Sequence, residues 1–303
     1  MLSLLRRPCF FISGLALAAS LIILPPPAAS PAPRKGLGAC PADGESAARV
    51  TGVDERLDIA LADGRIARLA GLDPPRPTPE APERDTEARA VLAAKIRGQN
   101  IDLTLLSQKP DRWGRIPALA FLARAGESER SIALILLRAG LARVKPQVEI
   151  RPCLKAWLAA EAEARAGRLG LWADPYYAVI AADDSSGFAE KAATDVIVEG
   201  RLASVVSSQM GLRLQFGTGH GRGFSVIILQ RNVRIFEQAA MKFHSLVGRS
   251  LRVRGLLDTR FGPQIEIASP DEIEPIVGEE NKAELELRAE TPASITQVPP
   301  KKP

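Results

Sequence analysis

The sequence predicts a mainly β protein with helices, an α+β fold built as two five-stranded barrels in succession. Short segments with an apolar residue at every second position occur in two groups, within residues 47–177 and 195–276. A helical segment follows the third strand of each group. A run of small and polar residues, 178–194, separates the groups and is predicted to be a linker.

The first group begins with three predicted strands joined by tight turns. Residues 50–53 form the first strand, and residues 57–61 alternate apolar and polar side chains, as a half-buried strand does. Asp63-Gly64 is typical of a hairpin turn because glycine adopts a positive φ without steric strain. The third strand, 66–72, ends before Pro74-Pro75, which cannot continue a hydrogen-bonded ladder.

The remaining elements complete a barrel with three helices. Residues 74–85 contain five prolines and are predicted to be a loop. The other expected elements are helix 83–97, strands 100–106 and 116–122, and helices 131–139 and 152–166. Five strands with a helix between the third and fourth are typical of an OB-type barrel.

The second group repeats this pattern. Its expected elements are strands 195–206, 212–216, 224–229, 250–257 and 264–267, with a helix at 234–246. They predict a second OB-type barrel. Residues 277–303 are charged and lack aromatic side chains, so they are predicted to be a disordered tail.

Composition narrows the function only slightly. The chain has 303 residues, a formal net charge of +5 and 5% aromatic residues. A modest basic excess fits an anionic polymer as partner, and it equally fits a solubilising surface charge. The sequence contains no phosphate-binding loop, dinucleotide fingerprint, zinc-ligand spacing or nucleophile elbow, which removes the motif-based support for those classes of enzyme.

The N-terminus has the pattern of a secretory signal. Arg6-Arg7 precede an apolar run, residues 9–24, and small residues follow up to Ser30. We therefore expect a signal peptide at 1–30, a flexible arm at 31–46, and a periplasmic or secreted protein. An uncleaved membrane anchor is the alternative, and no further membrane-spanning segment is expected.

Removal of this signal leaves two cysteines, Cys40 and Cys153. An even pair in an oxidising compartment predicts a disulfide, which would close a long loop between the start of the first barrel and its last helix. The alternative is two separate thiols.

Three short motifs carry a resemblance to a known family. Residues 68–75 read RLAGLDPP, residues 111–115 read DRWGR, and residues 167–172 read GRLGLW. In this order they resemble the R-L-x-G-I-D-x-P-E, D-x-Y-G-R and G-x-G-L/I-W signatures of the thermonuclease (staphylococcal nuclease-like) family. The resemblance covers about residues 47–177. A shorter stretch of the second barrel, within 248–267, resembles OB-fold modules attached to some secreted nucleases.

The resemblance implies a site for phosphodiester chemistry. It makes Arg68 and Arg115 a phosphate clamp and Asp73 a ligand of Ca²⁺. The chain also departs from the family pattern, because Leu57 occupies the position of an acidic calcium ligand and Arg76 that of the general base. We therefore expect weak or absent Ca²⁺ binding and impaired hydrolysis.

Further residues are candidates for the site because of their positions in the sequence. Arg76 is a candidate third phosphate contact, and Glu80 is a candidate relocated general base, with Glu83, Glu55 and Asp58 as further carboxylates nearby. Arg252 and Arg254 alternate with apolar residues on a strand of the second barrel. They predict an exposed arginine row for nucleic acid, and a solvated sheet face is the equally weighted alternative.

Three hypotheses about function follow. The preferred one is a monomeric periplasmic or secreted protein that binds DNA or RNA through its phosphates, with impaired or lost calcium-dependent cleavage. The second is an active nuclease with a relocated base. The third is a protein-interaction module of the cell envelope, since barrels of this type serve many binding roles.

Overall fold

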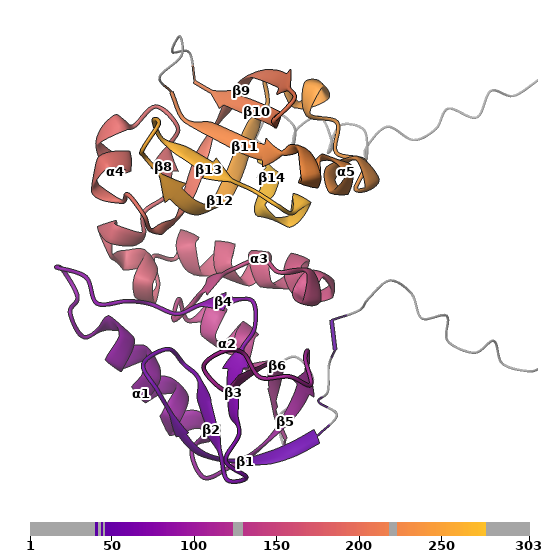
Figure 1. Ribbon diagram of the computed structural model, residues 1–303. Coiled ribbons are helices and arrows are strands. Elements are labelled where there is room, and N and C mark those ends of the chain that lie inside the picture. Colours follow the sequence, from indigo (N-terminus) through magenta and orange to yellow (C-terminus); the bar gives the residue numbers. More distant parts are fainter. Residues whose placement is uncertain (1–39, 42–43, 45, 124–129, 218–222, 277–303) are drawn as a thin grey trace, which may run out of the picture. The chain divides into compact units, whose positions relative to one another are not determined.

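The first barrel closes through five strands. The structure of the protein is a computed structural model, and it describes residues 40–41, 44, 46–123, 130–217 and 223–276. The strands are β1 (Ser46–Val53), β2 (Ile59–Leu61), β3 (Ile66–Leu69), β5 (Asn100–Leu105) and β6 (Arg115–Leu122). Their order in the barrel is β1-β2-β3-β6-β5, with β3 and β6 parallel and the other neighbouring pairs antiparallel (Figure 1).

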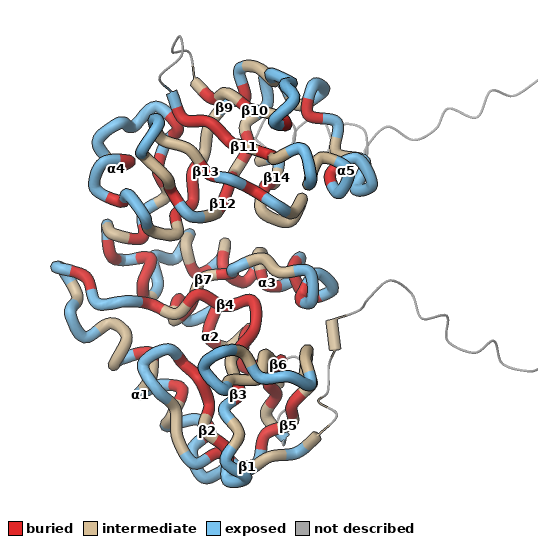
Figure 2. The backbone as a smooth tube through the Cα atoms, in the orientation of Figure 1, coloured by how far each residue is buried: buried red, intermediate tan, exposed pale blue. Residues whose placement is uncertain are grey.

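Three helices accompany this barrel, as predicted. They are α1 (Arg84–Ile96), α2 (Ile132–Arg138) and α3 (Arg151–Ala166). Leu92 and Ile96 of α1 and Trp157 of α3 are buried in the same apolar core as the strands. Figure 2 shows that buried residues occur along the strands and helices of both regions.

The second barrel has the same strand connectivity. Its strands are β9 (Asp195–Ser208), β10 (Gly211–Phe216), β11 (Ser225–Leu229), β12 (Ser250–Asp258) and β13 (Gln264–Glu266). They follow the order β9-β10-β11-β13-β12, and β12 also pairs with β9, which closes the ring. The parallel pair is β11 with β13, and the short strands β8 (Ile180–Ala181) and β14 (Ile273–Pro275) extend the sheet. The prediction of an α+β fold with a five-stranded barrel in the first region is thus confirmed, and the second region has the same order of five strands.

The third predicted strand is interrupted, which changes the surroundings of Asp73. Gly71 has φ +74°, and a Cβ there would lie 2.8 Å from the Trp157 ring. The chain therefore turns at Gly71 and leaves the barrel. A separate strand, β4 (Leu72–Asp73), then pairs with β7 (Arg143–Val144) in a two-stranded sheet.

Two predicted segments differ from the structure in the region of the second barrel. Residues 178–194 contain β8 and α4 (Ser185–Glu190) instead of a structureless linker, because Ile180 and Phe188 are buried in the second core. The helix predicted at 234–246 is α5 (Gln230–Gln238), followed by a 3-10 turn, η5 (Phe243–Leu246). The predicted signal segment 1–30, most of the arm 31–46 and the tail 277–303 lie outside the described residues. Within the described part, no helix is both long and apolar enough to span a bilayer.

The predicted disulfide is present. Cys40 and Cys153 are bonded, with their Cα atoms 4.3 Å apart and a sequence separation of 113 residues. Cys153 lies in the first turn of α3 and is fully buried. The bond therefore ties the segment that enters the first barrel to the helix that packs against its core.

A buried ion pair links α3 to the second barrel. The guanidinium of Arg254 on β12 lies 2.8 Å from the Glu161 carboxylate, and the two side chains are 6% and 1% exposed. Glu161 Oε1 also accepts a hydrogen bond from the Val144 backbone N–H at 2.7 Å. Arg254 donates to the Val144 carbonyl at 3.3 Å. Both side chains therefore hold β7 in place.

We predict that loss of the disulfide destabilises the fold. On the chain-entropy description, opening a loop of this length lowers the free energy of unfolding by about 4–5 kcal/mol. Urea unfolding with and without reductant measures the change, and a variant with both Cys40→Ser and Cys153→Ser is the control that must not respond to reductant. Equal unfolding midpoints of the wild type in both conditions would contradict the prediction.

We also predict that Arg254→Met is strongly destabilising, by about 3–5 kcal/mol, because it leaves the Glu161 carboxylate buried without its cation. Urea unfolding of Arg254→Met, Glu161→Leu and the double variant completes a double-mutant cycle. The double variant should be more stable than Arg254→Met alone. A loss below about 1 kcal/mol for Arg254→Met would contradict the assigned role of the pair, given the usual penalty for an unpaired buried charge.

Candidate anion-binding site

A cleft of roughly 690 Å³ opens beside β3, where the loop before β2, the strand β4 and the loop after it meet the start of β6. Its lining contains more cations than carboxylates. The charged lining residues are Arg56, Arg68, Arg76, Arg115 and Lys145, with Glu55, Asp58, Asp73 and Asp85.

Arg68 projects into this cleft because of its place on β3. Its neighbours Ala67 and Leu69 are buried in the barrel core, so the alternation of the strand turns Arg68 to the opposite face. The Nε atom of Arg68 is buried and has no hydrogen-bond partner within the described residues. A buried polar atom without a partner is rare in folded proteins, and a guanidinium is best satisfied by a carboxylate or phosphate oxygen.

Arg115 lies in the same cleft but is already paired. Its guanidinium donates to Asp58 at 2.9 Å and to Asp111 at 2.8 Å, and the Asp111 carboxylate also accepts from the Arg115 backbone. Both arginines of the predicted clamp line this cleft, and of these two only Arg68 has a buried side-chain nitrogen without a hydrogen-bond partner among the described residues. Trp113 is 54% exposed, and the Arg112 and Arg115 guanidinium carbons lie 3.9 and 4.9 Å from the centroid of its ring.

Asp73 is neutralised by an arginine. Its Oδ2 atom accepts from Arg143 Nη2 at 2.6 Å and from Nε at 3.2 Å, and its carboxylate is nearly buried. Arg143 reaches it because β4 and β7 pair, with Asp73 opposite Arg143. The sequence did not identify Arg143, since this pairing depends on the turn at Gly71.

The residues of this cleft do not fit a calcium ion. Leu57, at the position of a family calcium ligand, is 1% exposed and packs in the core with φ +60°. Asp73 already has a cation partner. No cluster of three or more His, Cys, Asp or Glu side chains suited to a metal occurs in the part of the chain that the structure describes. Calcium prefers six to eight oxygen ligands, and of the four carboxylates that line the cleft Asp58 and Asp73 are already paired with arginines.

Arg76 and Lys145 line the cleft with exposed side chains. The backbone of Arg76 is fixed by Tyr177, whose hydroxyl accepts from the Arg76 N–H at 2.7 Å. The Arg76 guanidinium lies 3.9 Å from Asp73 and 3.8 Å from Asp195. Lys145 follows β7 and donates to the Asp195 carboxylate at 3.1 Å. Asp195 was not among the predicted site residues.

The candidate general bases fall in different places. Glu80 and Glu83 are exposed and do not line the cleft, so the structure does not place Glu80 at the predicted site. Glu55 lines the cleft and lies 3.8 Å from Arg89. Asp85, in the first turn of α1, also lines the cleft and was not predicted. Its sequence position within a proline-rich loop gave no reason to choose it.

The predicted exposed arginine row of the second barrel is wrong. Arg252 pairs with Glu199 at 2.6 Å and with Glu274 at 3.0 Å, and Arg254 is buried against Glu161. Alternation placed both arginines on one face of β12 correctly. The acidic partners on neighbouring strands and on α3 could not be seen in the sequence of β12 alone.

Comparison with known protein families gives a match only within the region of the first barrel. Residues 67–174 match the sequence model of the family described as Staphylococcal nuclease homologue. The match contains Arg68, Asp73 and Arg115. A search of curated proteins found no match.

Asp58 and Asp111 both bind Arg115, but their pKa values should be shifted in opposite directions. Burial raises the pKa of Asp58 above its ordinary value of 3.8, although the hydrogen bond from Arg115 opposes this shift. Partial burial also acts on Asp111, but the Arg115 side chain and two backbone N–H groups outweigh it and lower its pKa to about 2. A carboxyl-detected NMR titration measures both values.

The signs of the linked stability changes follow. Asp111 contributes stability above pH 3.8 that is lost as pH falls towards 2, because its folded pKa is lowered. Asp58 binds its proton more tightly when folded, so its contribution is present at low pH and is lost as pH rises through its folded pKa. In an Arg115→Gln variant the pKa of Asp111 should rise. A pKa of Asp58 below 3.8 in the wild type would contradict the assignment.

Proposed function

We propose that this protein, whose residues 67–174 form a staphylococcal nuclease-like domain, binds nucleic acid through phosphates held in the cleft around Arg68. A domain of this kind indicates a nuclease-like, nucleic-acid-binding protein. The domain match agrees with the three motifs that the sequence carries at 68–75, 111–115 and 167–172.

The buried, unpartnered Nε atom of Arg68 is the observation that carries the proposal. A phosphate oxygen would supply its missing acceptor. Charge-assisted hydrogen bonds between guanidinium and phosphate are short and directional, and they are about twice as strong as neutral ones. Arg76 and Arg56, both exposed and lining the same cleft, add attraction for a polyanion.

We further propose that phosphodiester hydrolysis is impaired or lost. Cleavage needs an activated water, and general-base help is typically worth about 10²–10⁴-fold in rate. Arg76 stands where the family has its general base, and Arg143 occupies the Asp73 carboxylate. The retained cations therefore support binding better than they support catalysis.

An active nuclease is the second candidate, and one observation favours it. Asp85 and Glu55 place carboxylates in the lining of the cleft, where a relocated base would have to lie. The predicted signal segment and the Cys40–Cys153 disulfide both support a periplasmic or secreted location for either function.

We predict that Arg68→Gln weakens binding of a single-stranded oligo(dT) by roughly tenfold or more, as loss of a charged hydrogen bond typically does. The plot of log affinity against log salt should become flatter by about 0.7, since one phosphate contact is lost. Fluorescence anisotropy over a salt series measures both effects. Arg231→Gln is the matched control, because Arg231 is 72% exposed and lies on α5 outside the cleft.

The same samples test the metal and the chemistry. EDTA should leave binding unchanged, and neither Ca²⁺ nor EDTA should produce cleavage. Equal binding by the Arg68→Gln and Arg231→Gln variants would overturn the phosphate site. Calcium-dependent cleavage that disappears in Arg68→Gln would overturn the proposal that hydrolysis is lost. The next variants would then be Asp85→Asn and Glu55→Gln. Absence of any binding would favour the protein-interaction module.

A further inference from the structure

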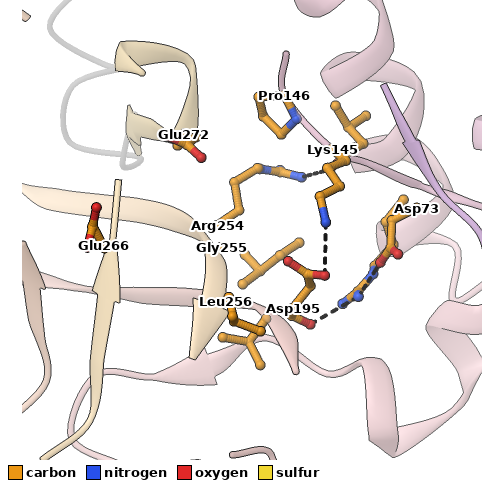
Figure 3. A pocket seen from close by; sticks show the side chains of 13 residues that line it. Asp73, Lys145, Pro146, Asp195, Arg254, Gly255, Leu256, Glu266 and Glu272 are labelled. Carbon is orange, nitrogen blue, oxygen red and sulfur yellow. Dashed lines mark hydrogen bonds and ion pairs between the residues drawn. The ribbon is translucent and has the colours of Figure 1, made fainter. Parts of the chain in front are cut away.

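Asp195, the first residue of β9, is in contact with three cations of the first region. Its carboxylate accepts from Lys145 at 3.1 Å and lies 3.8 Å from Arg76. Its backbone carbonyl accepts from Arg143 Nη2 at 3.0 Å. Figure 3 shows the contact between Lys145 and Asp195.

This arrangement adjoins the cleft around Arg68. A second cavity, of roughly 250 Å³, is lined by Asp195 and by residues of β12, and it shares Asp73 and Lys145 with that cleft. The other charged groups of this cavity are Arg143, Arg254, Glu266 and Glu272. Arg254 is bound to Glu161 and therefore does not compete with Lys145 for Asp195. The Glu272 carboxylate accepts two backbone N–H groups and also interacts electrostatically with Lys145.

The pairs made by the Asp195 carboxylate are easily exchanged. The side chains of Arg76 and Lys145 are 55% and 49% exposed, whereas that of Arg143 is 11% exposed. Solvent-exposed ion pairs contribute little net free energy, and a competing anion can therefore replace one partner. The backbone contact of Arg143 does not depend on the Asp195 side chain and would remain.

We propose that Lys145 and Arg76 form a second phosphate subsite, which the Asp195 carboxylate fills in the free protein. The inference rests on the proposed phosphate site at Arg68. A nucleic acid strand with one phosphate at Arg68 places a neighbouring phosphate between Lys145 and Arg76, because all three line one cleft. This phosphate displaces Asp195, so the second barrel limits how tightly the first region binds a polyanion.

Asp195→Asn tests the subsite. The amide keeps the size of the side chain and removes the competing charge, so oligo(dT) should bind roughly fivefold to tenfold more tightly. One further phosphate contact becomes available, and the salt dependence should steepen by up to about 0.7 in log–log slope. Glu266→Gln is the matched control, because this substitution changes the net charge by the same amount. The Glu266 side chain lines the same cavity but pairs with Arg231 instead of Lys145.

The Lys145→Gln variant tests whether the tighter binding of Asp195→Asn depends on Lys145. In the wild-type background it should weaken oligo(dT) binding and flatten the salt dependence, and in the Asp195→Asn background it should remove most of the gain. The first of these measurements does not require Asp195→Asn to fold. Thermal unfolding monitors the integrity of each variant.

The outcomes separate this inference from the proposed function. If Asp195→Asn and Glu266→Gln increase the affinity for oligo(dT) equally, the change in net charge explains the effect and the subsite is overturned. No gain in a folded Asp195→Asn, or no loss in Lys145→Gln, would also overturn it while a weakened Arg68→Gln keeps the Arg68 site intact. If Arg68→Gln binds as well as the wild type, the proposed function itself fails.

Discussion

The Glu161 carboxylate is the group on which the arrangement of the site depends. It is buried, and it accepts hydrogen bonds from the Val144 backbone and from Arg254 of the second barrel. An ionised group is stable in such an environment only when its partners satisfy it. The pair therefore holds β7 between α3 and β12, and β7 in turn fixes β4, where Asp73 lies.

Internal cations pair with the carboxylates in and beside this cleft. Arg143 binds Asp73, and Arg115 binds both Asp58 and Asp111, so two guanidinium groups pair with three carboxylates near the site. A fixed guanidinium neutralises a carboxylate without requiring an ion from solution. The Nε atom of Arg68, in contrast, is buried without a hydrogen-bond partner among the described residues.

Recognition of this region from sequence relied on local constraints. The run from Arg68 to Pro75 combines a strand, a turn at Gly71 and a proline stop, and each is encoded within a few residues. The same locality explains the error at β12. Arg252 and Arg254 alternate as an exposed row would, but their surroundings are set by Glu161, Glu199 and Glu274, which lie 22 to 93 residues away in the chain.

The sequence by itself determined the strands of the first barrel, its likeness to a staphylococcal nuclease domain and the position of Arg68 on the third strand, and it predicted the pairing of Cys40 with Cys153. These follow from period-two alternation, turn residues and short motifs, which are properties of neighbouring residues. Only the tertiary structure decided which charged side chains are paired with one another. Ion pairing of Asp73 with Arg143 and of Lys145 with Asp195 depends on contacts between distant segments, and no local pattern encodes them.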